Sequence, residues 1–173
     1  MPTSLEQIFT TFSCDKLLQL SERICACLDI LDAEQIWQRA SENENAIANL
    51  VLHLCGNLRQ WIGFGVAGNP DIRERALEFA SRGRIDVPEL KKRLRGAMEE
   101  AVSAIRELTP EALGQPTKIQ SYEVSVFEAV YHVVEHFAGH TGQIIFATKR
   151  LTGQDLAFYK HLERPKSHQE KVP

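Results

Sequence analysis

The chain has 173 residues, of which 43% are apolar and 25% are charged, and 20 Lys and Arg against 23 Asp and Glu give a formal charge of −3. This profile is typical of one soluble globular domain, which at this size buries roughly 70% of its unfolded surface without disulfides or structural metal. The near-neutral charge argues against nucleic acid and anionic membrane surfaces as partners.

The start of the chain carries neither a basic nor an apolar targeting region, and no stretch reaches the roughly 18 consecutive apolar residues of a membrane span. We therefore expect a cytoplasmic protein. All the cysteines lie in apolar sequence with helical spacing, which favours reduced, packed thiols over disulfides. These are Cys14, Cys25, Cys27 and Cys55.

The first half of the chain predicts two long helices. Ser4 followed by Gln7 fits a capping box, and apolar residues at helical spacing extend this helix to about Leu31. A short segment that Asp32 caps and the polar loop at residues 41–45 precede the second helix, which is expected to end near residue 65. Its predicted core stripe is Ile47, Leu50, Val51, Leu54, Leu58, Trp61 and Ile62.

The second half predicts two more helices. Residues 68–70 (Gly-Asn-Pro) break the chain, and residues 71–83 read as a charged connector with Leu77 and Phe79 as anchors. Asp86 and Pro88 open a third helix that is expected to run to about residue 108.

The last part of the chain predicts one short extended stretch at residues 119–124 and then the fourth helix, from Ser125 to Gly153. The sequence thus predicts an all-α four-helix bundle over residues 1–163 and a polar tail over residues 164–173. Periodicity does not choose the order in which the helices run up and down.

Histidines in the fourth helix recur every four residues, at His132, His136 and His140, so they lie one turn apart on the same side. Measured from the apolar face, His140 lies nearest the core, His136 next, and His132 most nearly toward solvent. In the second helix, Asn49, His53 and Asn57 form a stripe beside the apolar face. Packed as neighbours, the two polar strips would face each other across a groove.

Two imidazoles one helical turn apart can chelate a divalent metal, and a third from a facing helix leaves one coordination position open. An open position is typical of a reactive site. The competing interpretation is that these histidines, with Asn49 and Asn57, are ordinary hydrogen-bonded boundary residues. The zinc-peptidase motif is excluded, since Phe137 stands where its glutamate would follow His136.

Two segments resemble the DinB-like superfamily, namely residues 53–62 (HLCGNLRQWI) and residues 131–144 (YHVVEHFAGHTGQI). The specific feature is a lone His followed by a His-x-x-x-His-x-Gly-Gln pattern. The resemblance also takes in residues 71–76 and 78–79 and extends from the first helix to residue 159, close to a branch whose members are largely uncharacterised.

This resemblance implies an up-down-down-up bundle, often a homodimer, with a divalent metal on His53, His136 and His140. Zinc and nickel are the leading expectations for the metal, and iron is a third. Known members of the superfamily include metal-dependent transferases and isomerases that use low-molecular-weight thiols such as bacillithiol or mycothiol. Asn57 and Gln143 lie within about one helical turn of the implied ligands and are expected to support them.

Three functional hypotheses follow. The first is a metal-dependent hydrolase or thiol transferase, in which the open position activates water or a low-molecular-weight thiol for a small-molecule substrate. The second is a non-catalytic, dimeric interaction module with a stabilising metal. The third is a sensor of metal or oxidation through Cys55, which is disfavoured because residues two apart, such as Cys55 and His53, point to different sides of a helix.

Overall fold

The computed structural model describes residues 4–162, so the predicted polar tail at residues 164–173 lies outside the described residues. Four long helices dominate the chain: α1 (Leu5–Asp29), α2 (Ile47–Leu58), α4 (Val87–Arg106) and α6 (Val126–Thr152). The shorter elements are the 3₁₀ turns η1 (Gln35–Trp37) and η3 (Lys160–Leu162), the π-helix η2 (Arg59–Phe64), α3 (Arg75–Ala80), α5 (Pro110–Leu113), β1 (Pro116–Ile119) and β2 (Tyr122–Ser125).

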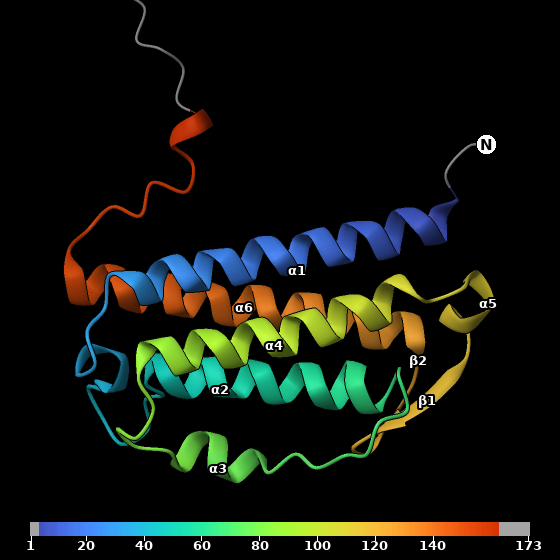
Figure 1. Cartoon of the computed structure of the whole chain (residues 1–173), viewed down its shortest axis with the longest axis horizontal. Helices are drawn as coiled ribbons and strands as arrows, with labels where there is room; N and C mark the ends of the chain where they lie inside the picture. The colour runs from blue at the N-terminus through green and yellow to red at the C-terminus, as the bar shows by residue number, and fades with distance from the viewer. Residues whose placement is uncertain (1–3, 163–173) are drawn as a thin grey trace, which may run out of the picture.

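The four long helices form the predicted bundle. α1 packs against α4 and α6, and α2 packs against the same two helices from the other side. Figure 1 shows α1 and α6 running from right to left and α2 and α4 running from left to right. The connection between α2 and α4 therefore returns along the length of the bundle, and α3 lies on this return path beside α2.

The ends of the helices follow the predicted signals. Ser4 and Ser125 each complete a capping box, and the Asp86 side chain accepts a hydrogen bond from the backbone N–H of Glu89. Gly153 ends α6 with a positive φ of 67°, a conformation that glycine adopts without a Cβ clash. These caps fix where α6 begins and ends, and hence the height of its histidines in the bundle.

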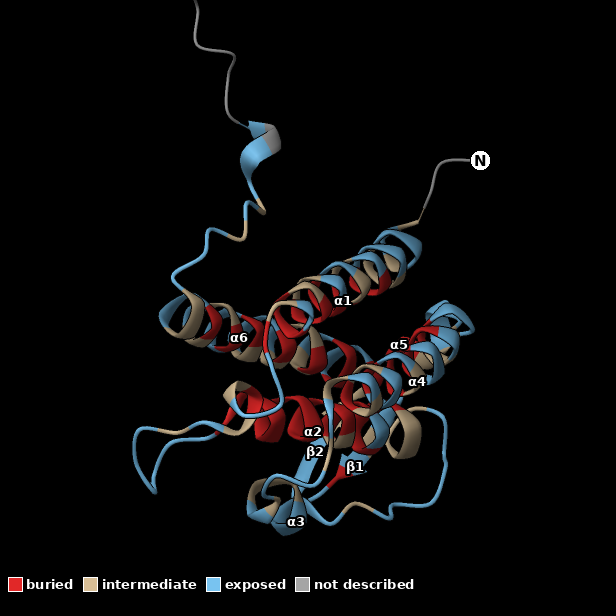
Figure 2. Ribbon diagram, turned by 60° about the vertical axis from the view of Figure 1, so that its left-hand side comes forward, coloured by how far each residue is buried: buried red, intermediate tan, exposed pale blue. Residues whose placement is uncertain are grey.

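The predicted core stripe of the second helix is buried throughout. Figure 2 shows the buried residues of the four long helices facing one another along the bundle axis. Phe137, in the middle of α6, is fully buried and holds that helix against its neighbours. The packed core thus sets the distance between α2 and α6.

Two segments differ from the sequence-based expectation. The stretch predicted as one extended segment is an antiparallel hairpin, in which Ile119 pairs with Tyr122 across a tight turn. In the connector, Phe79 is half-buried, but Leu77 is 59% exposed and is not an anchor. A six-residue helix buries only one narrow face, and in α3 that face carries Glu78 and Phe79.

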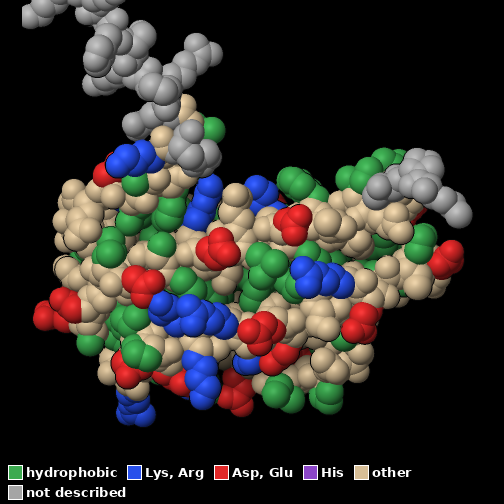
Figure 3. All heavy atoms as spheres, turned by 45° about the horizontal axis from the view of Figure 1, so that its top comes forward, with side chains coloured by type: hydrophobic (Ala, Val, Ile, Leu, Met, Phe, Trp, Pro, Cys, Tyr) green, Lys and Arg blue, Asp and Glu red, His purple; other side chains and the backbone are tan. Residues whose placement is uncertain are grey.

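On the face shown in Figure 3, acidic and basic side chains alternate with apolar ones. No helix within residues 4–162 combines the length and apolar character that crossing a membrane requires. The four cysteines are buried and unpaired, as predicted.

Candidate metal centre

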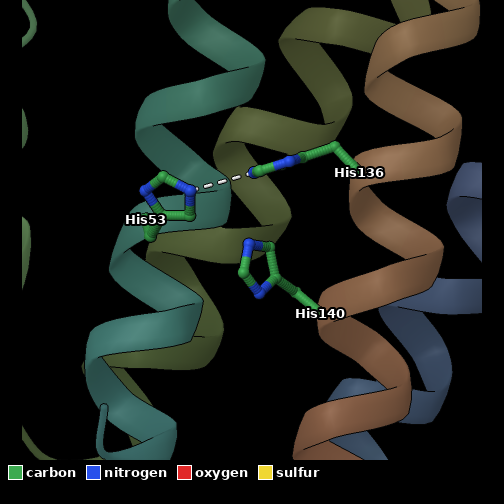
Figure 4. Close-up of side chains that lie close together, drawn as sticks. All are labelled: His53, His136 and His140. Carbon is green, nitrogen blue, oxygen red and sulfur yellow. Dashed lines mark hydrogen bonds between the residues drawn. The ribbon is translucent and has the colours of Figure 1, made fainter. Parts of the chain in front are cut away.

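Three histidines meet between α2 and α6, with His53 on α2 and His136 and His140 on α6 (Figure 4). The Nε2 atoms of His53 and His136 lie 2.9 Å apart. One ring nitrogen from each of the three histidines lies within 4.8 Å of the other two. The three side chains therefore converge on one point from two helices.

Burial distinguishes these histidines from surface residues. The His53 residue is 5% exposed, and His136 and His140 are half-buried. Burial, with His140 and His53 nearby, lowers the pKa of His136 to about 3. Burial also lowers the pKa of His140. At neutral pH both rings are neutral and keep a free lone pair, which is the form that coordinates a metal.

Glu78 orients the His53 ring. Nδ1 of His53 lies 3.0 Å from Oε2 of Glu78 and 3.0 Å from Nη2 of Arg73. In the tautomer in which Nδ1–H donates to the carboxylate, Nε2 is unprotonated and directed at the cluster. Arg73 clamps the same carboxylate, with Nε donating to Oε1 at 2.7 Å and Nη2 donating to Oε2 at 2.8 Å. Burial tends to raise the pKa of Glu78, but the hydrogen bonds from Arg73 and His53 outweigh it and hold this pKa below its ordinary value.

Gln143 orients the His140 ring in the same way. The Nδ1–H of His140 donates to Oε1 of Gln143 at 2.8 Å, so that Nε2 is the free nitrogen. Such outer hydrogen bonds are the usual means by which a protein fixes the tautomer of a metal-binding imidazole. Two of the three rings are thus held with Nε2 directed at the cluster.

His132 lies outside this group. Its ring stacks on Trp61, with centroids 3.8 Å apart, and is half-buried. Burial lowers its pKa as well. The ring centroids of His132 and His136 lie 5.5 Å apart. His132 therefore neighbours the three-histidine cluster without belonging to it.

A polar network continues outward from Arg73. Its Nη1 donates to Oε1 of Gln60 at 2.9 Å, and Gln60 in turn donates through Nε2 to Asp71 at 2.8 Å. Gln120, at the turn of the hairpin, donates to the same Gln60 oxygen at 2.7 Å. The connector, η2 and the hairpin are therefore tied together behind His53.

The polar stripe of α2 is more deeply buried than the sequence predicted. Asn49, His53 and Asn57 were expected beside the apolar face, yet all three are buried because α3 and α6 pack against α2. The Nδ2 of Asn49 donates to the backbone oxygens of Glu78, at 2.8 Å, and Ser81, at 3.1 Å. Asn49 therefore fastens α3 in the place where Glu78 reaches His53.

The two residues expected to support the ligands have different surroundings. Gln143 contacts His140 directly, as described above. Asn57 is 3% exposed, and its Oδ1 has no hydrogen-bond partner among the described residues. The structure gives Asn57 no hydrogen bond to the three histidines within residues 4–162.

Sequence reasoning assigned no role to Glu78, Arg73 or Gln60. Glu78 stands 25 residues after His53, and no helical periodicity connects the two. The only available signals were the unusual charge density of the connector and the inclusion of residues 73 and 78 in the family resemblance. Neither signal says which carboxylate would reach which histidine.

The comparisons identify the family. A family model described as "Protein of unknown function (DUF1572)" matches residues 6–167, nearly the whole chain. The chain belongs to this family. DUF1572 is a DinB-like family, so the resemblance found in the sequence is confirmed. No curated protein matches the chain.

Solved structures share the fold at low sequence identity. A conserved protein from Enterococcus faecalis has a TM-score of 0.72 at 14% identity, covering 84% of this chain and 98% of that one. A DinB-like protein from Bacillus cereus has a TM-score of 0.66 at 15% identity, covering 90% and 97%. A mycothiol-dependent maleylpyruvate isomerase has a TM-score of 0.62 at 14% identity, and the match covers 78% of this chain and 60% of that enzyme.

Proposed function

We propose that this DUF1572 protein is a metal-dependent enzyme whose divalent ion is held by His53, His136 and His140. Zinc or nickel is the preferred ion and iron is the third candidate, because imidazole nitrogens suit all three. The substrate is a small molecule, and the reaction is hydrolysis or the transfer of a low-molecular-weight thiol.

The orientation of the rings carries this proposal. The hydrogen bonds to Glu78 and Gln143 turn the Nε2 atoms of His53 and His140 toward the cluster, where Nε2 of His53 shares a hydrogen bond of 2.9 Å with Nε2 of His136. In the metal-bound form both of these nitrogens would coordinate the ion instead. A carboxylate behind a buried histidine is the usual second layer of a metal site.

Three protein ligands leave a coordination position for a reactant. A divalent ion there would lower the pKa of bound water to about 7 and would stabilise a thiolate, which provides a nucleophile at neutral pH. The contribution of the chain is to orient the imidazoles, to keep them neutral and to surround them with packed side chains. The fold likeness to a mycothiol-dependent isomerase supports the thiol branch, although at 14% identity it extends to the fold alone.

Elemental analysis of single variants tests the proposal. We expect near-stoichiometric metal in the wild type and a loss of most of it in His53→Ala, His136→Ala and His140→Ala. His132→Ala is the matched control, because its ring lies on the same helix face but stacks on Trp61. A wild-type protein that cannot be loaded with zinc, nickel or iron would refute the proposal.

The second candidate function is a homodimeric interaction module with a stabilising metal. It is favoured by large apolar side chains that α1 and α6 leave exposed, namely Leu5, Ile8, Phe12, Phe127 and Tyr131. Exposed apolar surface of this kind marks interaction sites. A dimer in solution, a large drop in melting temperature with chelator and no turnover with water or thiol nucleophiles would favour this candidate over the enzyme.

A further inference from the structure

A groove of about 550 Å³ adjoins the surroundings of the metal centre at Gln143. Its walls come from residues 38–45, from the start of α2 and from the second half of α6. Gln143 is the residue common to the two sites, since it lines the groove and accepts the hydrogen bond from His140. A volume of this size suits a small organic molecule.

Two guanidinium groups line this groove, from Arg39 and Arg150. The Nη2 of Arg39 is buried and has no hydrogen-bond partner among residues 4–162. Arg150 forms no ion pair within the same described residues. A buried guanidinium nitrogen without an acceptor is costly, so its environment favours a bound anion.

Glu44, the acidic residue of the groove, forms no ion pair with either arginine within residues 4–162. The carboxylate of Glu44 accepts a hydrogen bond from the backbone N–H of Ala40 at 2.6 Å, which holds it against its own loop. Arg39 instead donates to the backbone oxygen of Glu44, at 3.4 Å. Both arginines therefore keep donors for a ligand, and Arg side chains form paired hydrogen bonds with planar oxyanions.

The remaining lining is mainly apolar. Ile47 and Leu50 are buried at the base, while Phe146 is 65% exposed and offers an aromatic face at the rim. A ligand that fills the groove would thus combine an oxyanion with an apolar body.

Gln143 connects such a ligand to the histidines. Because its Oε1 accepts from His140, the two hydrogens of its Nε2 are left for another acceptor. A molecule held by Arg39 and Arg150 therefore lies beside the residue that orients a metal-binding ring.

We propose that this groove binds small amphipathic molecules that carry a carboxylate or phosphate group, and that it presents them to the metal centre. The role as a substrate site rests on the proposed function, whereas the binding of the oxyanion does not.

Isothermal titration calorimetry with defined probes tests the binding. The probes are 3-phenylpropionate and phenyl phosphate, and 3-phenylpropanamide is the neutral control. We expect at least one anion to bind at least tenfold more tightly than the amide, and Arg39→Gln and Arg150→Gln each to weaken its binding about tenfold. Lys149→Gln removes the same charge one residue away, on a side chain outside the groove lining, and should leave binding unchanged.

Two results would overturn the inference: equal binding of the anions and the amide, or anion binding that both arginine variants retain while circular dichroism shows them folded. Metal content measured in the same samples separates this failure from failure of the proposed function. Full metal with no Arg-dependent anion binding refutes the groove alone. Arg-dependent binding in a protein that takes up no metal refutes the metal-dependent enzyme and leaves the oxyanion site standing.

Discussion

The Nδ1 atom of His53 lies 3.0 Å from Oε2 of Glu78, and this contact joins the bundle to the short helix α3 beside it. The same carboxylate accepts two hydrogen bonds from Arg73, whose side chain is 5% exposed. Glu78 is thus fixed on one side by a buried cation and on the other by the ring that it orients. Removal of any of these hydrogen bonds should therefore lower the affinity of the metal site.

Substitution of Glu78 should weaken metal binding without removing a ligand. We expect Glu78→Gln to lower the affinity about tenfold and Glu78→Ala by up to about 100-fold, because the amide is a weaker acceptor and alanine offers none. Competition with a chromophoric chelator measures the change. Glu74→Gln, on an exposed neighbour, is the matched control. An affinity in Glu78→Ala within twofold of the wild type would contradict this role.

Gly56 allows the Glu78 carboxylate to approach α2. A Cβ built at Gly56 would lie 1.9 Å from Oε1 of Glu78 and 2.9 Å from Nε of Arg73, so alanine must push both side chains aside. We expect Gly56→Ala to lower the metal affinity at least tenfold, as the loss of an outer hydrogen bond does.

Gly96, within α4, is the control for the Gly56 variant because a Cβ there meets no atom within 4 Å. Gly96→Ala should leave metal binding intact and raise the free energy of unfolding by about 0.5–1 kcal/mol, as alanine is the better helix former. Urea denaturation and the chelator assay report the two quantities. Unchanged metal affinity in a folded Gly56→Ala protein would argue against the carboxylate contact.

The sequence predicted the four long helices because the signals for helix ends and helix faces are local. Ser4, Asp86, Ser125 and Gly153 act on the backbone within one turn, and the apolar stripe of α2 needs only a 3.6-residue period. The convergence of His53 with His136 required the packing of α2 on α6, which the sequence supports only through the facing polar strips and the family resemblance.

Sequence reasoning missed the contacts of Glu78 because they depend on α3, a segment without apolar periodicity. α3 has six residues, so neither its position nor its inward face can be inferred from an apolar pattern. Its position depends on hydrogen bonds over long separations, such as that from Asn49 to the backbone oxygen of Glu78. For the same reason, the depth at which Asn49 and Asn57 are buried followed from the packing of α3 and α6 on α2 and not from their place on α2 alone.

Gln143 should contribute to metal affinity through His140. Gln143→Leu removes the acceptor of the Nδ1–H bond and should weaken metal binding about tenfold, while Gln143→Glu, a stronger acceptor, should retain at least the wild-type affinity. Gln154→Leu, at an exposed position beyond α6, controls for the loss of an amide. If Gln143→Leu and Gln143→Glu bound metal equally, the hydrogen bond to His140 would have no part in orienting the ring.

The buried thiols predict a loss of stability at alkaline pH. Burial raises the pKa of Cys55 to about 12, and it also raises the pKa values of Cys14, Cys25 and Cys27. In the unfolded chain these thiols ionise near their ordinary value of about 8.5, so above this pH the unfolded state releases protons that the native state retains. The stabilising contribution is complete below the unfolded value and is lost as pH rises toward the folded value.

Urea denaturation between pH 8 and pH 11 tests this expectation. The free energy of unfolding should fall with pH, and Cys55 alone should account for up to about 1.4 kcal/mol per pH unit. Cys55→Ala loses some stability at every pH because it leaves a cavity, but its pH dependence should be shallower than that of the wild type. Reaction of Cys55 with a thiol reagent at pH 8 should also be slow and equal with and without bound metal, since the residue is 4% exposed. A fast, metal-dependent reaction of Cys55 would instead support the sensor hypothesis. Parallel pH profiles of the unfolding free energy for Cys55→Ala and the wild type would show that Cys55 does not titrate as expected.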